Sequence, residues 1–253
     1  MLSQFLVSEL FAFLLIFCRL GSALMLLPGF GEVYVPTRVR LLLALMFSMT
    51  LTPVIHSIPA VPTTTFGLLQ LLIGEIMIGL FLGGLGRMLI SALHVAGTII
   101  AYMSSMSSSL TQDIASFQGQ DTSISNLLSF TAVVLLFVTD LHHMMLKGLA
   151  DSYTLFLPGH FPIVEDFANH ATHIMSSTFQ MAMQLAAPNI VIGLILYLGA
   201  GILARLMPGI QIFFLLMAPQ LLLSFFIIMT TFSAIMLWYL DFFKDTLGTF
   251  LAP

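Results

Sequence analysis

The chain has 253 residues, of which 59% are hydrophobic and 7% are charged, and its formal net charge is −4. A soluble domain carries about 25% charged residues, and a soluble fold needs polar cover for its surface. A mean hydropathy of +1.08 therefore predicts an integral membrane protein. The seven Lys and Arg residues form no basic run, which argues against nucleic acid as a partner.

The sequence predicts an all-α fold of polytopic membrane helices, several broken by Gly or Pro and packed as helical hairpins. The alternation of polar and apolar residues that is typical of a membrane β-barrel is absent from the sequence. The single cysteine, Cys18, excludes an intramolecular disulfide. The first apolar stretch is longer than a signal-peptide core, so we expect it to be retained.

The first half of the chain predicts two hydrophobic helices and one long apolar stretch. The first helix runs from Phe5 to Leu27, about 35 Å at 1.5 Å per residue. A second begins at Arg40 and ends near Thr52, before a proline-containing link over 56–65. The apolar stretch 66–102 is too long for a single span, and a break or kink is expected at its glycines near Arg87.

The polar segment 103–126 interrupts this apolar chain. It is rich in small hydroxyl and amide side chains, and it begins with Met103 and Met106. Irregular polar chain at membrane depth must line water or be buried in protein, because lipid cannot satisfy its backbone groups. The segment is therefore either an ordinary loop outside the bilayer or a segment that lines or closes an aqueous path.

The second half predicts a helix over 127–146, an amphipathic segment over 165–184 and two apolar helices over 190–206 and 210–240. An amphipathic tail follows from Asp241. Helix breaks are predicted at Pro28, Gly31, Pro36, Pro208 and Pro219.

Charged residues within or beside the apolar runs are the candidate structural contacts. A bare charge at mid-bilayer costs about 3 kcal/mol or more, so such residues usually face protein, a cavity or a partner. We expect buried or inter-subunit polar contacts at Arg19, Arg38, Glu75, Asp140 and Arg205. The sequence does not indicate which of them pair, and Arg87 is a candidate for reaching the membrane surface beside its glycines.

The sequence contains no recognisable catalytic motif, and we predict no catalytic residue, cofactor or metal site. A metalloprotease pair, a nucleophile elbow and a phosphate loop are all missing from it. His142 and His143 are adjacent, so on a regular helix they point about 100° apart and form a poor chelate. With Asp140 they form either a polar cluster or ordinary helix-end histidines.

Several short motifs, spread in order along the chain, resemble the FliR/SctT family of type III secretion export-gate proteins. The first are Arg19-Leu20-Gly21, Pro28-Gly29-Phe30-Gly31 and Val35-Pro36-Thr37-Arg38-Val39-Arg40. The later ones are Asp140-Leu141-His142-His143, Leu157-Pro158-Gly159, Ala187-Pro188 and the segment 201–208. Pro208-Gly209-Ile210-Gln211 departs from the family's more common Pro-Gln-x-Asn.

The resemblance implies a single export-gate domain over 1–253, in the inner membrane and the flagellar basal body. It implies a FliP-like part (1–102 and 127–184), a plug loop (103–126) and a FliQ-like C-terminal hairpin (185–253). The partners it implies are several copies of FliP and FliQ around one copy of this chain, then FlhB and FlhA, membrane lipid and unfolded export substrates.

The resemblance also implies that the central loop seals the pore beside a methionine ring. The positions matched to this plug are Met103, Met106, Ser107, Ser108, Ser109, Leu110, Asp113, Phe117 and Gln118. Methionine is flexible and apolar, so it can close a constriction and reshape around a passing chain.

Two other classes stay open at this point. A virulence-type (SctT) gate subunit shares the same motifs. A small secondary transporter with broken helices is the second alternative, although no internal repeat supports it.

Overall fold

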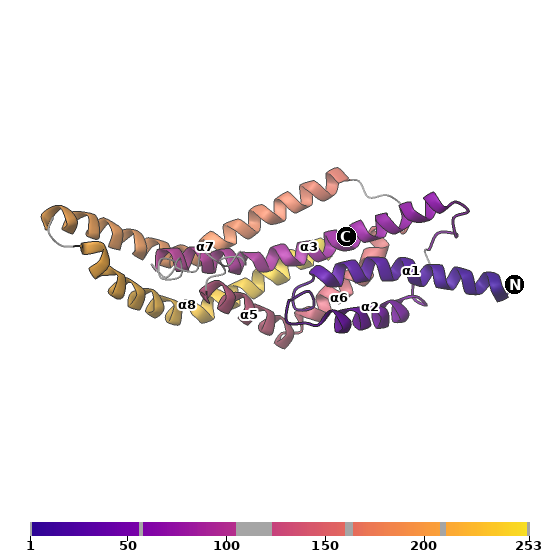
Figure 1. Cartoon of the computed structure of the whole chain (residues 1–253), viewed down its shortest axis with the longest axis horizontal. Coiled ribbons are helices and arrows are strands. Elements are labelled where there is room, and N and C mark those ends of the chain that lie inside the picture. The colour runs from indigo at the N-terminus through magenta and orange to yellow at the C-terminus, as the bar shows by residue number, and fades with distance from the viewer. Residues whose placement is uncertain (1, 56–57, 105–122, 160–163, 208–210, 252–253) are drawn as a thin grey trace. The chain divides into compact units, whose positions relative to one another are not determined.

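The computed structural model describes residues 2–55, 58–104, 123–159, 164–207 and 211–251. Its helices, shown in Figure 1, are α1 (Leu2–Leu26), α2 (Thr37–Leu51), α3 (Thr65–Met103), α5 (Ser123–Val138), α6 (Leu141–Leu155), α7 (Val164–Leu206) and α8 (Ile212–Leu251). The described residues contain no strand, so the predicted all-α fold class is confirmed.

Among the described residues, four helices are long and apolar enough to cross a membrane: α1, α3, α7 and α8. The pair formed by α5 and α6 passes the same test together, although it is bent by 77°. In the apolar stretches of α1, α3, α7 and α8, only 28–44% of the residues are buried by the chain itself. The protein is thus a polytopic membrane protein that leaves much apolar surface for lipid or other protein.

The chain divides into two compact units, and α3, α7 and α8 each contribute to both. The first unit contains residues 1–89, 136–175 and 244–253, and the second contains 90–135 and 176–243. The predicted boundaries of a FliP-like part, a plug and a FliQ-like part stay a prediction.

In the first unit, the glycines of α3 pack directly on α1. A Cβ atom at Gly79 would overlap the Ser22 hydroxyl and the Arg19 carbonyl, and one at Gly83 would lie 2.5 Å from the Ala23 carbonyl. The expected break near Gly83 and Arg87 was wrong, because α3 continues from Thr65 to Met103. These glycines permit close approach of α3 to α1.

The turn between α1 and α2 contains three of the residues predicted as helix breaks, Pro28, Gly31 and Pro36. α1 ends at Leu26, just before Pro28, and Gly29 adopts φ +81°, a conformation that favours glycine. The Gly31 amide donates to the Leu27 carbonyl at 2.7 Å. Pro36 precedes the first residue of α2, which begins at Thr37, three residues earlier than expected.

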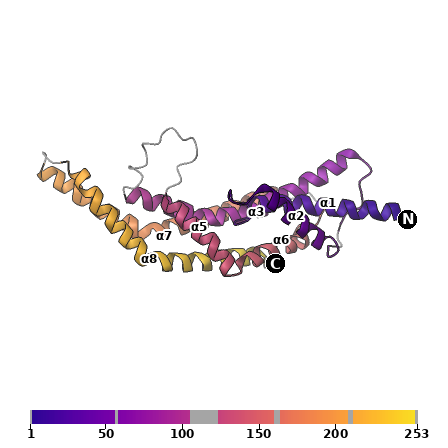
Figure 2. The same cartoon turned by 60° about the horizontal axis from the view of Figure 1, so that its bottom comes forward.

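The helix predicted over 127–146 is two helices, α5 and α6, which meet at a sharp bend (Figure 2). Asp140 lies between them with φ 59° and ψ 13°, the left-handed conformation. An aspartate tolerates this conformation better than most residues but does not mark it as glycine would, so the sequence pattern missed the bend.

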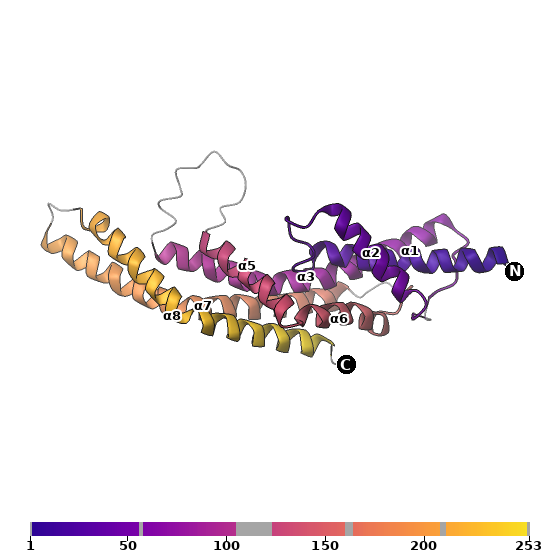
Figure 3. The same ribbon diagram turned by 90° about the horizontal axis from the view of Figure 1, so that it is seen from below.

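In the second unit, α7 and α8 run side by side (Figure 3), and Ser224 Oγ donates to Asn189 Oδ1 between them at 3.0 Å. α7 is one helix from Val164 and passes through Pro188, although two segments were expected. The break predicted at Pro219 was also wrong, because α8 continues through it. Packed membrane helices tolerate proline when neighbours satisfy the freed carbonyl. Pro208 lies outside the described residues.

Candidate functional site

A buried ion pair joins α1 to α3 in the first unit. Arg19 Nε donates to Glu75 Oε2 at 2.6 Å, and Arg19 Nη2 donates to Glu75 Oε1 at 3.2 Å. Arg19 is 0% exposed and Glu75 is 2% exposed. This two-pronged arrangement matches the planar guanidinium to the carboxylate and fixes the relative rotation of the two helices.

The same guanidinium closes the C-terminal end of α6. Arg19 Nη1 donates to the carbonyl and hydroxyl of Ser152 at 3.2 and 3.3 Å, and Nη2 donates to the Phe156 carbonyl at 3.0 Å. The Arg19 Cζ atom also lies 4.0 Å from the centre of the Tyr153 ring. A cation at a helix C-terminus compensates its unpaired carbonyls and partial negative charge. Arg19 thereby connects three helices at one point.

A cavity of about 230 Å³ lies beside this ion pair. Its lining includes Glu75 together with Gln70, Gly74, Pro62 and Gly159, all in the first unit. A water needs about 10–15 Å³ of such space and two or more polar partners. The cavity therefore has room for several waters next to a carboxylate that is otherwise enclosed.

A second ion pair holds the turn between α1 and α2 against α3. Arg87 Nη1 donates to Glu32 Oε1 at 2.6 Å, and half of the Arg87 side chain is exposed. Arg40 Nη2 donates to the Glu32 and Val35 carbonyls at 2.5 and 3.1 Å. The pKa of the Tyr34 hydroxyl is raised, mainly by partial burial and to a smaller extent by the Glu32 carboxylate, whereas Arg87 acts to lower it. These contacts fix the turn rather than form a reactive centre.

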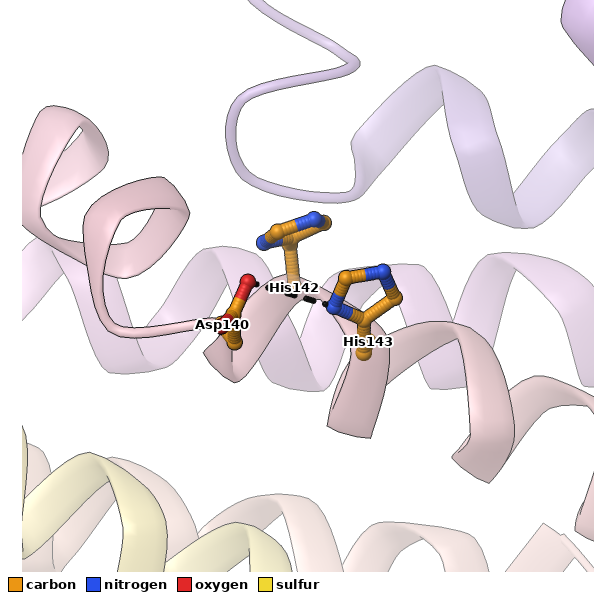
Figure 4. A group of neighbouring side chains, drawn as sticks. All are labelled: Asp140, His142 and His143. Carbon is orange, nitrogen blue, oxygen red and sulfur yellow. Dashed lines mark ion pairs between the residues drawn. The ribbon is translucent and has the colours of Figure 1, made fainter.

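The structure separates the five predicted charged residues into two groups. Arg19 and Glu75 are buried and paired with one another. Arg38, Asp140 and Arg205 are exposed on this chain. Asp140 lies 3.4 Å from the Nδ1 atom of His143 (Figure 4), and both side chains are largely exposed. Whether the exposed three contact other subunits stays a prediction.

Of the residues predicted to form the plug, only Met103 is described. Met106, Ser107, Ser108, Ser109, Leu110, Asp113, Phe117 and Gln118 lie outside the described residues. Met103 is the last residue of α3, and its carbonyl accepts from Gln220 Nε2 of α8 at 2.5 Å. Its side chain lies against α7, where a Cβ atom at Gly193 would lie 3.3 Å from it.

The polar segment has two stems, which are the C-terminal end of α3 and the first turn of α5. In the second unit these stems contact each other. A Cβ atom at Gly97 of α3 would overlap Ser125 Cα and would lie 2.7 Å from the Ser125 amide nitrogen. Ser125 is 0% exposed and stands in the first turn of α5. The helix entering the segment and the helix leaving it are thus in backbone contact, and Gln220 ties the first of them to α8.

Three contact residues were not predicted from the sequence: Ser152, Tyr153 and Gln220. Each is a polar side chain in an apolar surround, as Glu75 is, but neutral polar groups are too common in membrane helices to be singled out. Arg19 and Ser152 are 133 residues apart, so no local spacing connects them.

These features define a class of protein: a polytopic all-α membrane protein whose helices are held by buried polar contacts. A family model described as bacterial export proteins, family 1, matches residues 10–246. The flagellar biosynthetic protein FliR of Caulobacter vibrioides is 32% identical over 93% of this chain and 94% of its own length. FliR of Bacillus subtilis is 26% identical over 94% and 92%, and that of Escherichia coli 30% over 74% and 70%.

The chain therefore belongs to the FliR family of bacterial export proteins, and it is a component of the flagellar export apparatus. This family is a structural export family and not a known enzyme family. Membership places the chain's apolar helices in the inner membrane. The predicted family resemblance is confirmed.

Proposed function

We propose that this chain forms, with FliP and FliQ, the pore through which unfolded flagellar proteins cross the inner membrane. One copy of the chain per complex, with FlhB and FlhA as further neighbours, completes the proposed assembly. Family membership supports it, and so do four spans with at most 44% of their residues buried by the chain itself. Such apolar surface is suited to packing against other hydrophobic subunits.

Within this pore, the segment 103–126 is the seal at rest. The observation that carries this proposal is the hydrogen bond from Gln220 to the Met103 carbonyl, together with the backbone contact of Gly97 and Ser125. Both stems of the polar segment are held at defined places on packed helices. A segment with fixed stems can return to the same closed position after a substrate has passed.

The seal is tested by deleting residues 106–120 in cells that carry the whole export apparatus. We expect ions to leak across the membrane while export of flagellar subunits persists, because the stems and the pore wall are unchanged. Membrane potential and secreted flagellar protein are the two measurements. The matched control replaces the same residues with a Gly-Ser segment of equal length, which tests length against side-chain chemistry.

A point change tests the stem. Gln220→Glu removes the amide donor and places a carboxylate against the Met103 carbonyl, so we expect leakage without loss of the chain from the membrane. Ser224→Ala alters the neighbouring contact with Asn189 but leaves Met103 paired, and it serves as control. An unchanged membrane potential in both the deletion and Gln220→Glu would refute the seal.

The flagellar branch is favoured over the virulence branch, because the relatives compared above carry the name of a flagellar biosynthetic protein.

Purification in mild detergent distinguishes an export-gate subunit from a secondary transporter. We expect the chain to co-purify with different hydrophobic subunits, whereas a transporter would run as a monomer or homo-oligomer.

A further inference from the structure

Asp140, His142 and His143 form a cluster of metal-ligating side chains at the start of α6. Each offers one ligand atom, and the three atoms lie within 4.8 Å of one another. In Figure 4 the three side chains project from the same side of the chain. All three belong to the first unit. None of them takes part in the ion pair of Arg19 and Glu75 or in the stem contacts of the polar segment.

We propose that this cluster binds one divalent first-row transition-metal ion of the Zn²⁺ type. Ions of this type favour a ligand set of two imidazoles and one carboxylate, whereas Mg²⁺ and Ca²⁺ select oxygen ligands. Three protein ligands leave the fourth tetrahedral position for water.

The distance between two of the ligand atoms already suits a metal ion. Ligands at about 2.0–2.1 Å from a tetrahedral Zn²⁺ are about 3.3 Å apart. The Nδ1 atom of His143 lies 3.4 Å from Asp140 Oδ1. A metal ion can therefore bind between these two atoms at their present spacing.

The third ligand needs only a small rotation. The His142 ring lies 4.1 Å from the His143 ring and 4.8 Å from the Phe137 ring, centre to centre. Its Nδ1 atom is buried and has no hydrogen-bond partner within the described part of the chain. The three ligand atoms are at most 4.8 Å apart. A His142 ring nitrogen therefore has to move by at most about 1.5 Å to reach the spacing of tetrahedral ligands. The divergence expected of adjacent histidines on a regular helix is not what the structure shows.

The geometry of Asp140 explains why the three groups meet. Asp140 is the residue before α6, where an aspartate usually accepts from the helix amides, but its side chain makes no such bond. The left-handed backbone turns the carboxylate toward His143 instead. A bound ion would join Asp140 to the first turn of α6.

The test uses the full chain in detergent, carrying a histidine-free affinity tag, with Zn²⁺ alone as the probe. We expect one Zn²⁺ per chain by equilibrium dialysis and metal analysis, with zinc K-edge absorption showing both nitrogen and oxygen ligands. His143→Gln and Asp140→Asn should each weaken binding about tenfold or more. His173→Gln, an exposed histidine of α7, should leave binding unchanged.

Both test residues are largely exposed, so the variants are expected to fold, and their elution profiles verify this. The absorption spectrum of the unaltered chain provides a readout that needs no variant. Failure of the unaltered chain to bind Zn²⁺ would overturn the proposal. Binding that survives both His143→Gln and Asp140→Asn, or that is lost with His173→Gln, would do the same.

Discussion

The buried pair of Arg19 and Glu75 makes the most exacting prediction about this chain. Glu75→Leu leaves a fully enclosed guanidinium with two of its five hydrogen-bond acceptors removed. Breaking a buried pair by removing one partner destabilises a protein by about 3–5 kcal/mol. Since 1.4 kcal/mol corresponds to a factor of ten, the folded fraction relative to the unfolded should fall by about a hundredfold or more.

The pair of Glu32 and Arg87, in which the arginine is half exposed and the glutamate is 16% exposed, is the control. It has the same bond length of 2.6 Å, but the Arg87 side chain is 49% exposed. Glu32→Gln should therefore cost only about 0–1 kcal/mol. The assay is the free energy of unfolding of the full chain, measured by titration from mild detergent into a denaturing one.

The double variant Arg19→Met with Glu75→Leu separates the pair from the helix-end contacts. It leaves no unpaired buried charge, so it should be more stable than Glu75→Leu alone. Some loss should persist, because the Ser152 and Phe156 carbonyls lose their donor. If Glu75→Leu destabilises the chain no more than Glu32→Gln does, the reasoning about burial is refuted.

Two further variants test helix packing and assembly. Gly79→Leu should destabilise the first unit by about 1–3 kcal/mol or more, as overpacking does, since a Cβ atom there overlaps α1. Gly84→Ala has open space and should not destabilise the chain in the same unfolding assay, because alanine favours the helix over glycine by up to about 1 kcal/mol. Arg205→Gln removes an exposed charge from the last turn of α7. It should lower recovery of the assembled complex while the chain's own stability falls by at most about 1 kcal/mol. Glu165→Gln at the other end of α7 is its control, and full assembly of Arg205→Gln would contradict an inter-subunit role.

The elements that the sequence predicted well are those with strong local signals. Apolar length and Pro28 place α1 within a few residues, and Pro36 marks the start of α2. The membrane class follows from composition alone, because no arrangement of these residues could hide so much apolar surface. Family membership needed no geometry, since short motifs in the right order carry it.

The elements that the sequence misplaced depend on neighbours distant in the chain. Gly83 reads as a helix break until α1 is seen to pack on it. Asp140 carries no turn signal, and its conformation is set by the meeting of α5 and α6. Glu75 and Arg205 looked alike as charges in apolar runs, yet only Glu75 is buried by this chain. Which charges pair is decided by the packing of whole helices.

The contacts of Arg19 have a consequence for how the protein is made. Arg19 emerges from the ribosome 56 residues before Glu75 and 137 residues before Phe156. Until Glu75 emerges, the nascent first helix carries an uncompensated positive charge in its apolar length, which disfavours stable residence in lipid. Translation of α3 therefore supplies the charge partner of α1 and translation of α6 supplies the remaining acceptors, so a chain truncated before Glu75 should leave its first helix poorly anchored.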